Sequence, residues 1–134
     1  MIFKTTTRYA VCAALYIAQH GKQRVITAGE IAAKRGIPYS YLPRILSRLA
    51  KCGIIKSFHG GREKGYRMVR DANEISVFDV FDMFEGWSRE GCLLRPANED
   101  CMCPAHHHWK RIQEEMFAPL KRYKLGTCLG VPAR

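Results

Sequence analysis

The residues with the clearest capacity for chemistry are cysteines and histidines crowded together late in the chain. The stretch CLLRPANEDCMCPAHHH, from Cys92 to His108, holds three cysteines and three consecutive histidines. Thiolate and imidazole are the ligands that suit zinc or an iron–sulfur cluster. Because Cys103 and His106 stand three residues apart at a predicted helix start, their side chains share nearly one face. With Cys92 and Cys101 they would form a metal site of three cysteines and one histidine.

Three other interpretations of this segment compete with a metal site. The thiols could be free and without function, or a disulfide could form, although a Cys101–Cys103 ring would be strained and a reducing cytosol disfavours it. The histidines could be only the polar face of a helix, because consecutive helical residues point about 100° apart. The other three cysteines have no further cysteine or histidine close to them in the sequence. Cys12 and Cys52 are predicted to be small buried hydrophobes, and Cys128 a free thiol.

Basic side chains are concentrated in the first half of the chain. Residues 1–70 hold fourteen of the 22 Lys and Arg but only two of the 12 Asp and Glu, and the whole chain carries a formal charge of +10. A segment this basic repels itself, so a polyanionic partner is its simplest explanation. Nucleic acid is the first candidate and an anionic membrane surface the second. A solvated basic face without a partner is the alternative.

Helices are expected to carry much of this charge. Apolar spacing predicts a helix over 5–20. A capping box at Thr27–Glu30 opens a second, short helix, in which the Thr hydroxyl accepts a backbone N–H and Glu30 reaches back. Ser40 is expected to cap a third helix over about 41–52, with Pro43 in its first turn.

The third helix and the segment behind it complete a winged helix-turn-helix. The inward residues of this helix are Leu42, Ile45, Leu46 and Leu49. Two β-prone runs, 54–58 and 65–69, enclose a basic, glycine-rich tip and predict a hairpin. One helix fits the DNA major groove, and a neighbouring hairpin can reach the adjacent backbone or minor groove. A winged helix used for protein contact is the alternative.

Outward side chains of this unit are the candidate DNA contacts. Arg44 can pair with a guanine through two hydrogen bonds, whereas Arg48 and Lys51 are placed for phosphates. Arg62 at the hairpin tip is the candidate for the minor groove. The complete set is Ser40, Tyr41, Arg44, Arg48 and Lys51 on the third helix and His59, Arg62 and Lys64 on the hairpin.

The rest of the chain predicts two further helices around the cysteine segment. Ser76 and Asp79 can cap a helix that closes at Gly86, and apolar residues at helical spacing predict another over about 105–124. Pro119 is expected to kink or end that helix. The chain has no apolar run of about eighteen residues and no secretory signal pattern, which predicts a cytoplasmic protein without a membrane span.

Short motifs accompany this order of elements. They are Thr7-Arg-Tyr-Ala10 and Ala14-Leu15 in the first helix, then Glu30-Ile-Ala, Gly36-Ile-Pro, Tyr41-Leu42, Gly53-Ile54, Gly65-Tyr66-Arg67, Ile75-Ser76 and Glu85-Gly86. Together with the cysteine segment, they make the chain resemble the Rrf-two family of winged-helix regulators, the group with IscR-, NsrR- and RirA-type proteins. The resemblance covers nearly the whole chain.

The resemblance implies a mainly α fold with a small β-hairpin wing and a long C-terminal dimerisation helix. It implies a homodimer on a roughly palindromic double-stranded DNA operator, acting as a transcriptional repressor and not as an enzyme. An iron–sulfur cluster would control operator affinity, with 2Fe–2S favoured over 4Fe–4S, and its ligands would be Cys92, Cys101, Cys103 and His106. Zinc or a thiol switch in the same loop is the alternative.

Three parts are therefore expected in the chain. Residues 1–70 form the winged helix-turn-helix domain, residues 71–124 hold the cysteine sensor loop and the dimerisation helix, and residues 125–134 are a flexible tail. Loss or oxidation of the centre would free the loop and the start of the last helix, and so change either the spacing of the two half-sites or the angle of the wing. An enzyme with a cysteine nucleophile is disfavoured because no cofactor or nucleotide motif is present.

Overall fold

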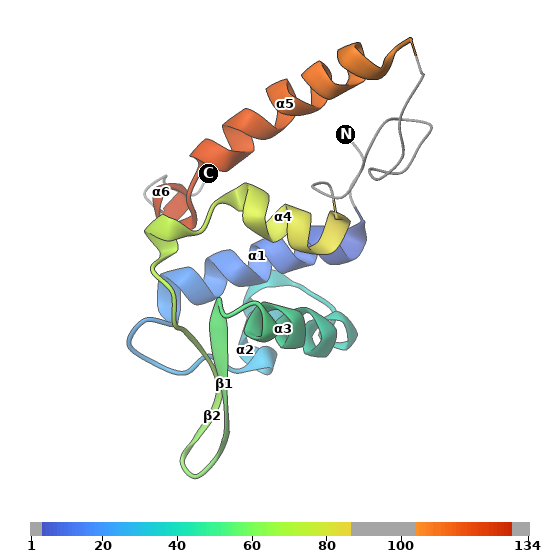
Figure 1. Ribbon diagram of the computed structural model, residues 1–134. Helices are drawn as coiled ribbons and strands as arrows, with labels where there is room; N and C mark the ends of the chain where they lie inside the picture. Colours follow the sequence, from blue (N-terminus) through green and yellow to red (C-terminus); the bar gives the residue numbers. More distant parts are fainter. Residues whose placement is uncertain (1–3, 87–103, 130–134) are drawn as a thin grey trace.

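A computed structural model describes residues 4–86 and 104–129 of the chain, apart from the side chain of Glu63. Its elements, labelled as in Figure 1, are α1 (Thr5–His20), α2 (Ala28–Arg35), the 3₁₀ turn η1 (Tyr39–Tyr41), α3 (Leu42–Lys51), β1 (Ile55–Gly60), β2 (Glu63–Met68), the 3₁₀ turn η2 (Ala72–Glu74), α4 (Val77–Glu85), α5 (His106–Arg122) and α6 (Leu125–Leu129). This order confirms the mainly α fold with a two-stranded hairpin.

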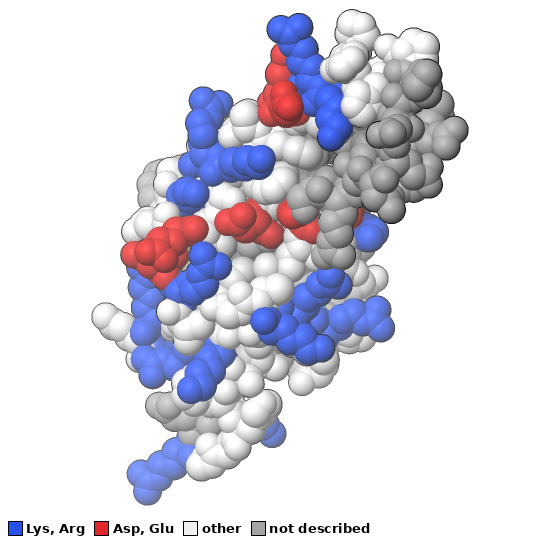
Figure 2. Space-filling view, viewed as in Figure 1, with Lys and Arg blue, Asp and Glu red and all other residues white. Residues whose placement is uncertain are grey.

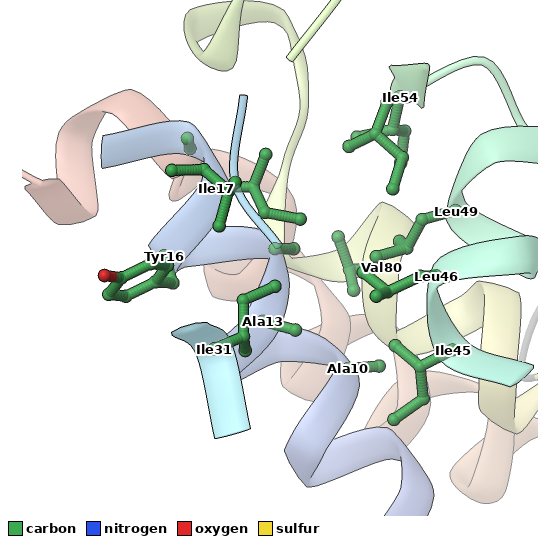
Figure 3. Packing of buried hydrophobic residues seen from close by; sticks show 14 of the residues in the cluster. Ala10, Ala13, Tyr16, Ile17, Ile31, Ile45, Leu46, Leu49, Ile54 and Val80 are labelled. Carbon is green, nitrogen blue, oxygen red and sulfur yellow. The ribbon is translucent and has the colours of Figure 1, made fainter. Parts of the chain in front are cut away.

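Helix α1 lies at the centre of the core because its wide apolar face is built from small residues. Ala10, Ala13 and Ile17 are fully buried, and α1 contacts α2, α3, α4, α6 and β2. Leu46 and Leu49 of α3 point into the same core from the facing side (Figure 3). The alanines let neighbouring backbones approach closely, so α1 serves as the support for the other helices.

Helix α3 is strongly amphipathic, as its apolar spacing predicts. Its inward residues are all fully buried, namely Leu42, Ile45, Leu46 and Leu49. Fully burying one such side chain is worth about 1.5–3 kcal/mol, so four of them fix the rotation of the helix about its axis. The opposite face, which carries the basic residues, is therefore held toward solvent.

The hairpin is attached to the helices through the strand β2. Strands β1 and β2 pair antiparallel, with Ile55 opposite Met68 and His59 opposite Lys64. On its other edge, β2 exchanges two backbone hydrogen bonds of 2.8 Å between Tyr66 and Ile26, the residue just before α2. A single β-bridge at Ile26 thus attaches the two-stranded hairpin to the segment before α2, and the hairpin projects away from the helices (Figure 1).

Two predicted helix starts differ from the structure. The Thr27 hydroxyl accepts the Glu30 N–H at 3.1 Å as expected, but the Glu30 carboxylate does not reach back and binds other donors. Ser40 is not a cap, because it lies inside η1, and α3 begins at Leu42 without a side-chain cap. A tight turn satisfies the backbone there, so no side chain is needed, and Pro43 lies in the first turn as predicted.

Two expectations for the end of the chain are also corrected. Helix α5 does not end at Pro119 but continues to Arg122, because only one hydrogen bond is lost so close to its end. Residues 125–129 form α6 instead of a flexible tail, and Leu125 is fully buried. Its N–H bonds to the Ile75 carbonyl at 2.8 Å, a long-range contact that local patterns do not reveal. The remainder of the predicted tail, 130–134, lies outside the described residues.

The capped start of α4 is confirmed in both directions. The Asp79 N–H donates to the Ser76 hydroxyl at 3.0 Å, and the Ser76 N–H donates to the Asp79 carboxylate at 2.9 Å. Gly86 closes the helix with a left-handed φ of 73°. Helix α4 packs on α1, and α5 lies at the end of the molecule opposite the hairpin (Figure 1). Among the described residues, no helix is long and apolar enough to cross a membrane.

Candidate nucleic-acid interface

The outward face of α3 presents most of the predicted contacts to solvent. Arg44, Arg48 and Lys51 are exposed on successive turns, and Ser40 is exposed in η1. Arg44, Arg48 and Lys51 therefore lie on the predicted outward face, whereas Ser40 is exposed in the turn before the helix and not on the helix itself. Ser47, which the sequence reasoning missed, is exposed between Arg44 and Lys51. It lines one hollow on the face of α3 itself and another between α3 and the hairpin. Its position three residues after Arg44 was a usable signal, because such residues share a helix face.

Tyr41 differs from its neighbours because it is half-buried and structural in part. Its ring packs edge-on against the ring of Tyr9 in α1, with the centroids 4.9 Å apart. Aromatic pairs of this geometry contribute about 0.5–1.5 kcal/mol beyond their buried area. Tyr41 thus fixes the start of α3 to α1. It also lines a hollow with Ser40 and Arg44, so part of its surface faces the predicted DNA side.

Arg48 makes a contact that sequence patterns did not indicate. Its guanidinium carbon lies 5.5 Å from the centre of the Phe84 ring, near the end of α4. Glu85, the next residue, accepts hydrogen bonds from the Thr7 hydroxyl at 2.7 Å and the Lys4 N–H at 2.8 Å. The end of α4 is therefore joined both to the exposed face of α3 and to the start of α1.

The hairpin residues and α3 face one groove. A hollow of about 360 Å³ between them is lined by Lys51 of α3 and by Ser57, His59 and Tyr66 of the hairpin. His59 is exposed, and its Nε2 is hydrogen-bonded to the Ser57 hydroxyl at 2.9 Å. Lys64, opposite His59 in the hairpin, lines a second hollow on the side of α2. The exposed Arg62 occupies the hairpin tip, between the two strands.

Tyr39 is a further residue that sequence reasoning missed. It precedes Ser40 in η1 and is 59% exposed, although it is a large aromatic side chain. It lines the second hollow together with Lys64 and Tyr66. Burial raises the pKa of the Tyr66 hydroxyl, and the charge of the nearby Tyr39 hydroxyl raises it further. No local pattern separates Tyr39 from an ordinary turn residue, so the structure was needed to find it.

Charge is distributed as the sequence arithmetic predicts. In the view of Figure 2, Lys and Arg side chains lie around α3 and the hairpin, whereas Asp and Glu side chains, together with further Lys and Arg, lie over α4, α5 and the region of α6. Of the two acids in the first half of the chain, Glu30 is described, and it is neutralised by Arg24. The described surface of α3 and the hairpin therefore presents a positive potential to any ligand.

Glu30 holds α2 in place through three hydrogen bonds. Its two carboxylate oxygens accept from the Arg24 guanidinium at 2.8 Å each, and one also accepts from the Tyr16 hydroxyl at 2.6 Å. The Arg24 and Tyr16 donors lower the pKa of the Glu30 carboxyl to about 2. The same bonds raise the pKa of Arg24 and of Tyr16. This network joins α1, the loop before α2 and α2 itself.

The predicted metal site is only partly visible. Cys92, Cys101 and Cys103 lie outside the described residues. His106 is the first residue of α5, and its Nδ1 is buried without a hydrogen-bond partner. An unpaired buried imidazole nitrogen is free to act as a ligand atom. Within 4–86 and 104–129, no three His, Cys, Asp or Glu side chains gather as a metal site.

The remaining cysteines are placed differently from what was expected. Cys12 is half-buried and packs against the core, which is near the predicted environment. Cys52 is exposed, so its prediction as a buried hydrophobe is wrong. It follows Lys51 at the end of α3, one residue before Gly53, where the chain leaves the core face. Cys128 of α6 is partly exposed and is a free thiol.

Comparisons with known proteins agree with this architecture. A family model for Rrf2, described as an iron-dependent transcriptional regulator, matches residues 3–129. The transcriptional regulator IscR of Photobacterium profundum is 41% identical over 127 residues, which cover 91% of this chain and 72% of that protein. IscR of Photorhabdus laumondii is 32% identical over 125 residues, covering 88% of this chain and 73% of that protein.

Solved structures share the fold. CymR, the global cysteine regulator of B. subtilis, superposes with a TM-score of 0.81 at 22% identity and covers 99% of both chains. IscR of T. potens superposes with a TM-score of 0.76 at 22% identity, covering 96% of this chain and 86% of that one. The mainly helical molecule with its hairpin matches the winged-helix structures of both. On the family match and the IscR relatives, the chain belongs to the Rrf2 family of transcriptional regulators.

Proposed function

We propose that this chain is a transcriptional repressor that binds a DNA operator through α3 and the hairpin, and that a metal or redox centre in the cysteine segment controls its affinity. The observation that carries the DNA-binding part is the groove between α3 and the hairpin. Basic side chains line this groove and its rims, and no described acid does. Its width is set by the buried face of α3 and the backbone pairing of β2, so it is formed before DNA binds.

Within this interface the side chains have separate tasks. Arg44, at the exposed start of α3, reads a guanine edge, while Lys51 and His59 contact the backbone on either side of the groove. Arg62 at the hairpin tip enters the adjacent minor groove. Ser40 and Tyr41 contact DNA beside Arg44. Arg48 is shared between a phosphate and the Phe84 ring, which ties this contact to α4.

A homodimer is proposed because α5 carries apolar side chains that the described residues leave uncovered. Ile112 is 53% exposed, and Tyr123, the residue directly after α5, is 56% exposed. Trp109, Met116 and Leu120 are only partly buried. A second copy of α5 would cover this face, and two chains related by a two-fold axis would present two copies of α3 to a roughly palindromic operator.

The donor set fits an iron–sulfur centre. Cys92, Cys101 and Cys103 would supply three thiolates, and the buried, unpaired Nδ1 of His106 would supply the fourth ligand. We favour a 2Fe–2S cluster, whose gain or loss of an electron would supply the redox signal. His106 begins α5, so ligation there would order the start of the proposed dimer helix.

The end of α4 offers the route from this segment to DNA. The segment starts directly after Gly86, and the residues before it contact α1 and α3 through Glu85 and Phe84. A change in the order of the segment would shift the position of α4 and thereby the freedom of Arg48. Coupling of about 1–3 kcal/mol would change operator affinity by roughly 5- to 150-fold.

The same donors support a second candidate, a zinc site or a thiol switch. Three thiolates and one imidazole also suit tetrahedral zinc, and closely spaced thiols can be oxidised reversibly. Colour and metal content separate these candidates, because zinc is colourless.

The test purifies the full chain without oxygen, measures its visible absorption, iron, sulfide and zinc, and selects its operator from random duplex DNA. We expect one iron–sulfur centre per chain and operator binding that changes on oxidation. The double variant Cys101→Ser and Cys103→Ser should lose both the colour and the response, while Cys52→Ser, as a matched control, keeps both. Unchanged regulation in the double variant would contradict the control mechanism, and stoichiometric zinc without colour would establish the second candidate.

A further inference from the structure

A second basic surface, the α2 patch, lies at the last turn of α2 and on the loop after α1. Its four members are all exposed, namely Lys22 and Arg24 of the loop and Lys34 and Arg35 of the last turn of α2. The first turn of α2 lines a hollow beside the hairpin, but no member of the patch lines this hollow or the groove between α3 and the hairpin. The α2 patch is therefore a surface separate from the predicted DNA contacts.

Two guanidinium groups of the patch are held in fixed positions. The Arg24 guanidinium donates two hydrogen bonds of 2.8 Å to the Glu30 carboxylate. The guanidinium carbon of Arg35 lies 5.3 Å from the centre of the Tyr16 ring. Tyr16 is a rigid support, since it is only 5% exposed and its hydroxyl donates to the same carboxylate at 2.6 Å. Guanidinium groups fixed in this way lose little conformational freedom when they bind a ligand.

The α2 patch carries positive charge that the described residues do not balance. Glu30 lies in the same cluster, but its charge is neutralised by Arg24. Within the described part of the chain, Lys22, Lys34 and Arg35 form no ion pair. One exposed cation attracts a partner only weakly, because water screens it. Several cations around a fixed guanidinium favour a ligand that carries more than one anionic group.

We propose that the α2 patch binds an acidic segment of a second protein, rich in Asp and Glu, through the fixed guanidinium of Arg35, while the chain is bound to its operator. The inference rests on the proposed function, because an operator in the groove leaves the patch free. Charge complementarity identifies the occupant, and the planar fork of Arg35 matches a carboxylate. A protein is favoured over DNA because Arg35 leans on α1 and the patch lines neither hollow beside the hairpin.

The experiment uses the full chain saturated with its selected operator, and a fluorescein-labelled poly-glutamate peptide as the probe. Fluorescence anisotropy measures the affinity of the complex for the peptide, while a second dye on the operator verifies that the DNA stays bound. The double variant Lys34→Gln and Arg35→Gln should bind the peptide about 3- to 10-fold more weakly, because two charge contacts are lost. Operator affinity should stay the same.

The single variant Arg35→Lys tests the fixed guanidinium separately from the charge. Lysine keeps the positive charge but has neither the planar fork nor the same stacking on Tyr16, so peptide affinity should fall about 2- to 5-fold. Both positions are exposed, so the variants are expected to fold, and thermal unfolding verifies this. Full peptide affinity in Arg35→Lys would overturn the inference, since it would show attraction by charge alone.

The double variant Lys110→Gln and Arg111→Gln is the matched control, because it removes the same charge from an exposed Lys-Arg pair on α5. Equal peptide affinity in this control and in the double variant of the patch would overturn the inference. Weaker binding of the patch variant to an operator with longer flanks would overturn it too, since DNA would then be the occupant. If the wild-type chain selects no operator, the proposed function fails, whereas peptide binding by the free chain and the same variants still tests the patch.

Discussion

Glu30 shows how a single residue can position the helix-turn-helix. Its carboxylate joins Arg24 and Tyr16, and its backbone N–H is held by the Thr27 hydroxyl. Its side chain is 25% exposed, whereas that of Arg24 is 51% exposed, so solvent screens part of the attraction. Tyr16 points from the core face of α1 toward this cluster, with its hydroxyl away from the apolar residues (Figure 3).

The variant Glu30→Gln is expected to lower the free energy of unfolding by about 1–2 kcal/mol at pH 7. The pKa of Glu30 is lowered from an ordinary 4.5 to about 2. Its contribution is therefore fully present above about pH 4.5 and is lost as the pH falls toward 2. Urea unfolding at a series of pH values should show this loss in the wild type and a weaker dependence in the variant.

The control is Glu115→Gln, which removes an exposed ion pair with Arg111 on α5. Such a pair contributes only about 0.3–0.5 kcal/mol, so the control should be nearly as stable as the wild type. Equal stability losses in both variants would show that the Glu30 network has no special role in holding α2.

At the scale of elements, the hairpin depends on the close approach of two backbones. Gly65 has a φ of 145°, and a Cβ added to it would lie 2.5 Å from the carbonyl oxygen of Ile26. The adjacent Tyr66 makes the two hydrogen bonds to Ile26 that attach β2 to the segment before α2. Only glycine fits at this position. Because it lets β2 lie directly against the segment before α2, the hairpin is held in a fixed orientation relative to the helices.

The variant Gly65→Ala is expected to lose about 1–3 kcal/mol of stability through backbone strain and to weaken operator binding, because the hairpin must move away from Ile26. Gly61→Ala at the hairpin tip is the control, since its φ is also positive, at 69°, but no atom lies within 4 Å of an added Cβ. Thermal unfolding and operator titration measure both variants. Retention of full affinity by Gly65→Ala would show that the attachment does not set the position of the hairpin.

At the scale of the whole molecule, α4 lies between the proposed DNA-binding face and the proposed control region. Its packing on α1 and the Glu85 contacts fix its end, and the Arg48–Phe84 contact extends this connection to α3. The DNA-facing elements and α5 lie at opposite ends of the molecule (Figure 1), so any coupling between them must pass through the helices in between. Among the described contacts that link α4 to α3, the Arg48–Phe84 contact can be removed by a single substitution.

The variant Phe84→Leu is expected to reduce the difference in operator affinity between the loaded and the metal-free protein by about 2- to 5-fold, the energy of one exposed cation–π contact. Metal content should not change, because Phe84 is not among the proposed ligands. Arg48→Lys, which keeps the charge but not the planar stacking group, should behave similarly. Operator titration of both forms measures the effect, and an unaltered difference would exclude this route.

The sequence by itself determined the order of the elements from α1 to α5 and the buried face of α3. Apolar spacing identified α1 and α3, the cap at Ser76 identified α4, and glycine-flanked β-prone runs identified the hairpin. These features are local, because helix and strand periods and caps depend on residues only a few positions apart. The uneven charge and the motif order likewise indicated a DNA-binding regulator of this family.

Only the tertiary structure decided which distant residues meet. The Glu30 carboxylate binds Arg24 and Tyr16 instead of the backbone N–H that its cap would use. Arg48 contacts the Phe84 ring, and Leu125 packs beside Ile75. Exposure of Tyr39 and Cys52 was decided in the same way. The physical reason is that such contacts arise from the packing of whole elements around α1, and sequence spacing carries no information on contacts between separate elements.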